Sequence, residues 1–290
     1  MESLDGVFRA SLNFTSKCNM GCQYCYIPFS RDTVDAVVVE RVLSRLFDIG
    51  VCSITIGGGD PLQYPFLIDA LPAVRSSFNF IQLDSNLIRL DSHAADTIVR
   101  NVDLVGVPLD GPNAQSHGQM RSSPDHFGQV MEAIKLLDHR VSVKINSVLS
   151  VRNYQTFLEL SDIVAEIEPL IWAIYQFWPI GDRARRFALR FILEDAKYRE
   201  IVELIRNRHP RQTIESGESA ERAGSYFFVN HNGLVYATDP HDQDKYVWLG
   251  SVFDADIVKR WLSVALLEKN KSRISERLKI VSSLRPISRD

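Results

Sequence analysis

The sequence predicts an α/β protein in which a parallel sheet carries helices on its outer face and a smaller α+β extension follows. Between residues 7 and 180, short apolar runs alternate with longer amphipathic stretches, in six strand-then-helix steps or nearly so. This alternation is typical of a parallel sheet. Polar motifs follow each of the first four predicted strands, at the edge where the chemistry of such folds lies. Right-handed crossovers between parallel units allow either a barrel or an open sheet.

Each element has its own local signal. Residues 7–13 alternate in polarity like a strand, and further strands are predicted at 52–56, 80–83, 102–107, 141–149 and 170–177. Asp32 or Thr33 is predicted to cap a helix that runs to about residue 48, because apolar residues recur there at helical spacing and Gly50 follows as a stop. Further helices are predicted at 65–76, 92–100, 125–137 and 154–166.

The pattern changes after residue 180. Residues 181–190 are basic, 193–208 predict a helix, and the polar residues 211–224 predict a loop. Asn232-Gly233 lies between the apolar runs 226–229 and 234–238, which predicts a hairpin. A last helix is predicted at 256–269, and the charged tail from Ser272 is predicted to be partly disordered.

Composition restricts the classes of function. The net charge of the 290 residues is −3, so bulk charge gives no nucleic-acid signature. The chain has no apolar run of the ~18 residues that a membrane span needs, and its N-terminus has no apolar signal-peptide region. Three of the four cysteines are clustered, which argues against a disulfide scaffold and favours the reducing cytoplasm.

The clustered cysteines are the strongest chemical signal in the chain. Cys18, Cys22 and Cys25 have the spacing C-x3-C-x2-C directly after the first predicted strand. A [4Fe–4S] cluster normally takes four thiolates, so three ligands leave one iron open to a small molecule. The alternatives are a zinc site or buried thiols, but zinc sites usually show four ligands in pairs, and the nearest histidine is the distant His93.

The loop resembles the cluster-binding loop of the radical S-adenosylmethionine (radical SAM) superfamily, with Tyr24 at the position of its aromatic residue. The resemblance implies one [4Fe–4S] cluster that holds SAM and cleaves it to methionine and a 5′-deoxyadenosyl radical, which abstracts a substrate hydrogen. It implies a partial (β/α)6 TIM-type barrel over residues 1–180, with residues 181–290 covering the barrel mouth. It also implies an electron donor such as a flavodoxin or ferredoxin.

The motifs after the next strands resemble the SAM contacts of this superfamily. Gly57-Gly58-Gly59-Asp60-Pro61 stands where a Gly-Gly-Glu-Pro turn is usual, so the resemblance assigns Gly58, Gly59 and Asp60 to the amino group of SAM. Ser85 and Asn86 are predicted to contact ribose through hydroxyl and amide groups, and the resemblance places Tyr24 against adenine. Asp110 either contacts ribose or holds its own loop through an Asx turn.

The substrate side is predicted from the fifth and sixth strands. Alternation places Lys144 and Asn146 on one strand face; we predict that this face looks into the barrel, as does Gln176. The segment Lys144-Ile-Asn-Ser-Val with the later Trp172 and Gln176 resembles the viperin branch, which dehydrates CTP. Phosphate contacts are then predicted for four arginines, although a solvated basic face is the alternative: Arg121, Arg183, Arg185 and Arg186.

Two other functions stay open at this stage. Ala173 stands where viperins have lysine, so the enzyme is alternatively one that tailors a peptide, sugar or natural-product precursor. A non-catalytic metal or interaction module is the third hypothesis. No cysteine follows Cys52, which we predict to be a small buried hydrophobe, so an auxiliary cluster is not expected.

Overall fold

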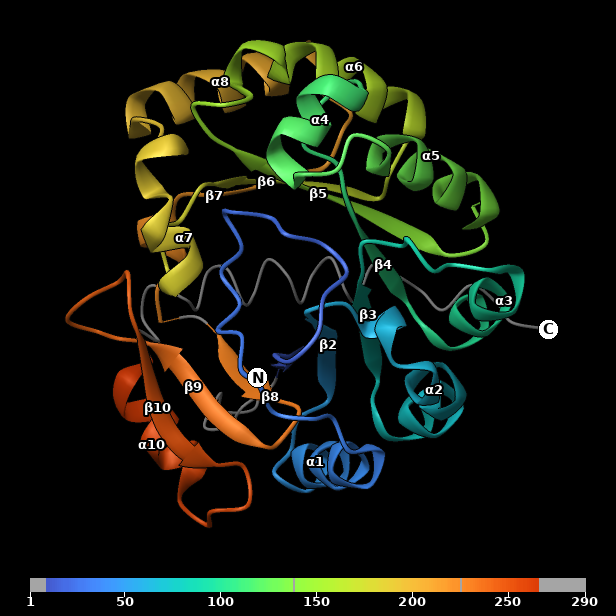
Figure 1. Ribbon diagram of the computed structural model, residues 1–290, viewed down its shortest axis with the longest axis vertical. Helices are drawn as coiled ribbons and strands as arrows, with labels where there is room; N and C mark the ends of the chain where they lie inside the picture. The colour runs from blue at the N-terminus through green and yellow to red at the C-terminus, as the bar shows by residue number, and fades with distance from the viewer. Residues whose placement is uncertain (1–8, 138, 225, 266–290) are drawn as a thin grey trace.

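The fold is an open, curved sheet with helices on its convex side. The computed structural model describes residues 9–137, 139–224 and 226–265. Within them, ten strands form one sheet in the order β10-β9-β8-β1-β2-β3-β4-β5-β6-β7. All pairs from β8 through β1 to β7 are parallel, whereas β9 and β10 pair antiparallel. The strands form a partial barrel that does not close, as predicted (Figure 1).

The six predicted strand-and-helix steps are confirmed. The strands are β1 (Arg9–Phe14), β2 (Ser53–Gly58), β3 (Phe80–Asp84), β4 (Leu104–Pro108), β5 (Ser142–Leu149) and β6 (Ile171–Gln176). The helices between them are α1 (Ala36–Asp48), α2 (Pro65–Ser77), α3 (Ser92–Asn101), α4 (Ala114–Arg121), α5 (His126–Leu137) and α6 (Phe157–Ile167).

Two local predictions in this half need correction. The cap of α1 is Asp35, whose carboxylate accepts hydrogen bonds from the N–H groups of Val37 and Val38; Asp32 and Thr33 lie too far ahead. Helix α4 was not predicted, because the residues it buries include the polar Ser116 and His117 and give no apolar periodicity.

The C-terminal part joins both ends of the sheet. Its elements are α7 (Asp182–Arg186), η3 (Ala188–Arg190), α8 (Asp195–Arg208), β7 (Ile214–Gly217), α9 (Ser219–Arg222), β8 (Phe227–Asn230), β9 (Leu234–Thr238), β10 (Tyr246–Ser251) and α10 (Ile257–Val264). The hairpin at Asn232-Gly233 is confirmed. The loop predicted at 211–224 is wrong, because residues 214–217 pair with β6 as an edge strand. The division at residue 180 stays a prediction, and the tail from Ser272 lies outside the described residues.

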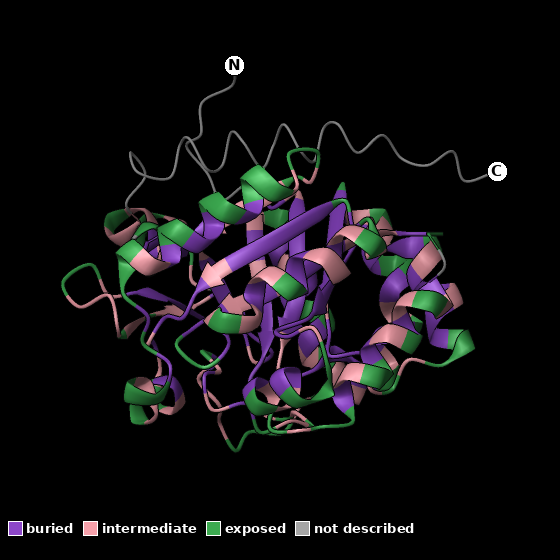
Figure 2. Cartoon of the chain, turned by 90° about the horizontal axis from the view of Figure 1, so that it is seen from above, coloured by how far each residue is buried: buried purple, intermediate pink, exposed green. Residues whose placement is uncertain are grey.

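The two faces of the sheet differ in polarity. Apolar residues such as Leu12, Ile54 and Ile145 fill the outer face and pack under the helices, so burial concentrates along the strands (Figure 2). Register places Asp84, Gly106 and Lys144 side by side on the opposite face, which we call the inner face. The face that looks into the partial barrel is therefore polar. Among the described helices, none has the length and apolar character to cross a membrane.

Candidate active site around the cysteine loop

The cysteine loop joins β1 to α1 and crosses the middle of the ring of strands (Figure 1, blue). Cys22 is buried, whereas Cys18 and Cys25 are partly exposed. Burial raises the pKa of Cys18 to about 11 and that of Cys25 to about 12, and in both the charge of Cys22 adds to the effect. The three sulfurs therefore lie close enough to interact, and binding a metal displaces their protons.

The glycine turn at the end of β2 packs against the start of this loop. The N–H of Gly59 donates to the carbonyl of Phe14 over 2.5 Å, and the N–H of Asp60 donates to that of Lys17 over 3.1 Å. A Cβ on Gly58 would collide with the backbone of Phe14, and one on Gly59 with the carbonyl of Lys17. Gly58 also has φ +103°. Only glycines let the two backbones approach this closely.

The donor set fits an iron–sulfur cluster. Three thiols project from one loop held by a glycine cradle, and an apolar group of side chains that includes Met120 and Phe191 surrounds Cys22. Within the described residues, no three His, Cys, Asp or Glu side chains are placed to share a single ion. Cluster ligands need not converge in this way, because each thiolate binds a different iron.

Asp60 connects the glycine turn to the turn after β3. Its carboxylate is 1% exposed and accepts from the backbone N–H of Asn86 over 2.7 Å, that of Leu62 over 3.0 Å, and the hydroxyl of Ser85 over 3.0 Å. Burial raises the pKa of Asp60 to about 6 despite these donors. The side chain of Asp60, although shorter than the glutamate usual at this position, thus holds the predicted ribose contacts Ser85 and Asn86 in place. The contact of Asp60 itself with SAM stays a prediction.

Asn86 faces the cysteine loop. Its Nδ2 donates to Oδ1 of Asn19 over 2.6 Å and lies 3.9 Å from Sγ of Cys18. The side chain of Asn86 is buried, and its Oδ1 accepts from the N–H of Ile88 over 3.1 Å. The structure therefore brings together the first cysteine, Asp60 and the predicted ribose contacts.

Asp110 fastens the aromatic residue of the loop. The hydroxyl of Tyr24 donates to its Oδ2 over 2.7 Å, Nε of Arg121 donates to the same oxygen over 2.6 Å, and the N–H of Val148 donates to Oδ1 over 2.7 Å. Burial alone would raise the pKa of Asp110, but Arg121 and these donors hold it below its usual range. The carboxylate thus joins the loop, α4 and β5, and its predicted contact with ribose stays a prediction.

Two buried histidines, which sequence reasoning missed, connect the same turns. The backbone N–H of Asp110 donates to Nδ1 of His117 over 3.1 Å. Nε2 of His117 lies 2.8 Å from Nδ1 of His126, and Nε2 of His126 lies 2.9 Å from the carbonyl of Asn86. A carbonyl only accepts, so His126 carries its proton on Nε2 and His117 must donate from its own Nε2. The chain of hydrogen bonds thus runs in one direction.

This arrangement predicts that both histidines stay neutral. Burial lowers the pKa of His117 to about 3 and that of His126 to about 4. In a ¹⁵N–¹H correlation spectrum, both rings are expected to show the Nε2–H form and no change as the pH falls from 8 to about 5. Single His→Gln variants assign the two signals. Titration of either ring near its ordinary pKa of about 6.5 would contradict the assignment.

The predicted substrate residues fall on different faces. Lys144 and Asn146 share the inner face, and Nζ of Lys144 lies 2.6 Å from Oε2 of Glu215 and 3.0 Å from the hydroxyl of Tyr175. The inward orientation predicted for Gln176 is wrong: strand alternation puts it on the outer face, where Nε2 donates to Leu193 and Asp195. Arg183 lies 4.7 Å above the Phe29 ring, and its charge acts on Cys25, where it opposes the rise in the pKa of that thiol.

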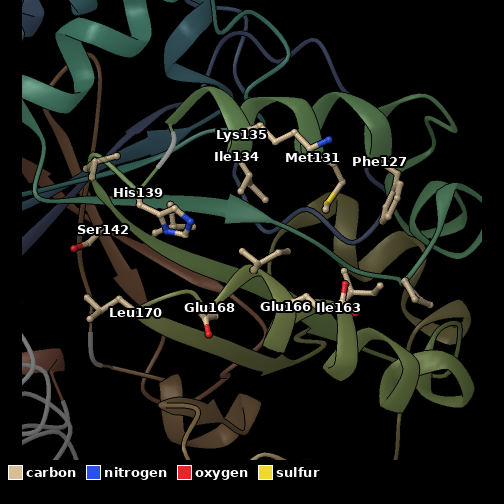
Figure 3. Close-up of a pocket in the computed structure, with 14 residues that line it drawn as sticks. Phe127, Met131, Ile134, Lys135, His139, Ser142, Ile163, Glu166, Glu168 and Leu170 are labelled. Carbon is tan, nitrogen blue, oxygen red and sulfur yellow. The ribbon is translucent and has the colours of Figure 1, made fainter.

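A groove between α5 and α6 lies away from this site (Figure 3). It has a volume of about 770 Å³ and is lined by residues such as Met131, Ile134 and Ile163, with Ser142 at the start of β5. The groove lies in the outer helical layer, and none of the predicted site residues lines it. The groove therefore adds nothing to the site.

Comparison with known proteins identifies the family. AlbA, the antilisterial bacteriocin subtilosin biosynthesis protein of Bacillus subtilis (strain 168), is 28% identical over 212 residues, 71% of this chain and 43% of its own length. A probable GTP 3′,8-cyclase of Methanopyrus kandleri is 29% identical over 165 residues, 55% of this chain and 53% of its own. The chain thus spans about half the length of these curated relatives.

Solved structures show the same fold. Streptococcus suis SuiB, bound to its precursor peptide SuiA, superposes with a TM-score of 0.67 at 15% identity, over 80% of this chain and 59% of its own. The family model of the radical SAM superfamily matches residues 12–164, which is 153 of the 290 residues. Members of that family use a [4Fe–4S] cluster and SAM, and this chain belongs to the radical SAM superfamily of enzymes.

Proposed function

We propose that this radical SAM enzyme modifies a side chain of a peptide or protein and acts in the reducing cytoplasm. The observation that carries the proposal is the balance of charge at the site. Arg121 lies 2.6 Å from the carboxylate of Asp110, and Lys144 lies 2.6 Å from that of Glu215. AlbA, named for bacteriocin biosynthesis, and SuiB, bound to a precursor peptide, support the same substrate class.

In this proposal Cys18, Cys22 and Cys25 hold the cluster, which supplies the electron that cleaves SAM to the 5′-deoxyadenosyl radical. The remaining roles belong to side chains and backbone of the chain. Gly58 and Gly59 let the end of β2 pack against the start of the cysteine loop, and Asp60 orients the turn that carries Asn86. Further proposed SAM contacts are Tyr24, Ser85 and Asp110.

The charge balance disfavours the viperin-like substrate. A nucleoside triphosphate carries several negative charges, and its binding needs cations whose charge is not already compensated. Two of the predicted substrate contacts, Arg121 and Lys144, each face a carboxylate at ion-pair distance. A peptide, whose groups are mainly neutral, needs no such excess charge.

An aromatic surface on the inner face suits a peptide side chain. The ring of Phe228 lies 5.1 Å from that of Tyr236, which lies 4.9 Å from that of Trp248. Tyr26, next to the last cysteine, lies 6.1 Å from Phe228. Trp248 is 51% exposed and Tyr26 40%, so both offer area to a ligand. Removing a full aromatic contact costs about 1.5–3 kcal/mol.

The test compares substrates with the reconstituted enzyme under anaerobic conditions. We expect a library of short random peptides to raise the rate of 5′-deoxyadenosine release from SAM and dithionite, and a deuterated peptide to transfer deuterium into that product. The four ribonucleoside triphosphates should not raise it. Stimulation by a nucleotide instead, or by no peptide at all, would reject the proposal.

A variant pair tests the aromatic surface. Trp248→Ala is expected to raise the KM for a responding peptide about tenfold, because a contact of about 1.4 kcal/mol is lost. SAM cleavage without peptide should not change. Phe47→Ala is the matched control, since Phe47 is 54% exposed on the outer helix α1. Equal KM values for both variants would place the peptide elsewhere.

A further inference from the structure

We propose that residues 182–192, the cap segment, form the docking surface for an acidic one-electron carrier protein. The segment comprises α7, η3 and the two residues that follow. The inference rests on the proposed function only in requiring a bound cluster. It assigns a docking surface to the electron donor that the family resemblance implies.

The inner side of the cap segment packs directly on the cysteine loop. Ala184 and Phe191 belong to the same apolar cluster as Cys22 and Tyr24, and the rings of Phe191 and Tyr24 lie 5.8 Å apart. Across the exposed edge, Nη1 of Arg190 donates to Oε1 of Gln23 over 3.2 Å. The outer surface of the segment is thus separated from the cysteines by about one helix diameter, ~10 Å.

The outer side combines positive charge with exposed apolar area. Arg185, Arg186 and Arg190 are exposed and outnumber the one acidic residue of the segment, the exposed Asp182. Between the arginines, Leu189 is 94% exposed. Ile192, at the end of the segment, is 50% exposed. Exposed apolar side chains surrounded by cationic ones are the usual composition of a small, transient interface.

Charge complementarity identifies the partner. The cap segment has four arginines and one aspartate, so it keeps an excess of positive charge although Arg185 also interacts with Asp242. This excess attracts a negatively charged surface. An acidic carrier with a reduced flavin or iron–sulfur group fits this patch, and redox encounters need little buried area. One electron then passes from the carrier, which is oxidised, to the oxidised cluster, which is reduced by one electron. No atom or proton is transferred.

The test reverses charges on the cap segment. Arg185→Glu/Arg186→Glu is compared with Arg199→Glu/Arg206→Glu, which makes the same change on exposed arginines of α8. With reduced flavodoxin as the probe, we expect the cap variant to bind the carrier about tenfold more weakly than the wild type. We expect it to accept the electron about tenfold more slowly. The α8 variant should match the wild type, and added salt should slow the wild type. With dithionite, all three should give the same yield of 5′-deoxyadenosine.

A second variant protects the test against misfolding. Leu189→Glu changes a side chain that is 94% exposed, so a loss of flavodoxin binding with intact iron content supports docking. Wild-type reduction rates in both cap variants would overturn the inference. The inference would also be overturned if a single-stranded RNA bound the wild type but not the cap variants, while flavodoxin reduced all of them equally. Absence of iron in the reconstituted wild type would instead overturn the proposed function.

Discussion

Replacing Cys22 by serine is expected to abolish both iron binding and SAM cleavage while leaving the fold intact. Serine has nearly the same size, and its hydroxyl can take over the contact of Sγ with the carbonyl of Arg121 at 3.7 Å. The substitution nevertheless removes the thiolate, which is the ligand that iron–sulfur clusters require. Iron and sulfide analysis after anaerobic reconstitution, followed by assay of 5′-deoxyadenosine, measures both losses.

Cys52→Ser is the matched control for this experiment. Cys52 precedes β2 and lies outside the cysteine loop, so its loss should leave iron content and SAM cleavage at the wild-type level. A Cys22→Ser protein that keeps a full cluster would show that this thiol is not a ligand. Loss of the cluster in the Cys52 variant would show that the ligand set extends beyond the triplet.

Gly59→Ala is expected to destabilise the protein strongly and to displace the cysteine loop. Its Cβ would collide with the carbonyl oxygen of Lys17, and the backbone of the cysteine loop cannot move away without breaking the bond from Gly59 to Phe14. Overpacking against a backbone carbonyl that cannot move costs about 3 kcal/mol. Chemical denaturation measures the loss of stability, and iron analysis the displacement of the loop.

Gly128→Ala is expected to have the opposite effect on stability. Gly128 lies in α5, and nothing is found within 4 Å of its added Cβ. Alanine in a helix is better than glycine by about 0.5–1 kcal/mol, so this variant should be slightly more stable than the wild type. If Gly59→Ala unfolded at the same denaturant concentration as the wild type, the close approach of turn and loop would be refuted.

The parts of the fold that sequence could predict are those with a strong local pattern. The apolar spacing of α1 and the Asn-Gly turn between β8 and β9 depend on neighbours in the chain. The site motifs were found for a related reason: parallel strands bring their C-terminal ends to one edge, so Asn86 and Cys18 could be expected to meet.

What sequence could not predict depends on partners far along the chain. Lys144 and Glu215 are separated by 71 residues, and nothing local marks either as half of an ion pair. His117 and His126 belong to no motif, and only tertiary packing turns them into a link between two turns. Strand β7 shows no clear alternation because it lies at the edge of the sheet and is mostly half-buried.

The place of β8 beside β1 has a consequence for the biogenesis of the enzyme. The strand that leads into the cysteine loop obtains its second neighbour only from residues 227–230, and Asn13 bonds Tyr236 across 223 residues. Because domains fold as the ribosome delivers them, β1 remains an unfinished edge until residues 227–230 have been made. Delivery of iron and sulfide to the loop thus has a natural interval, which closes when the last strands dock.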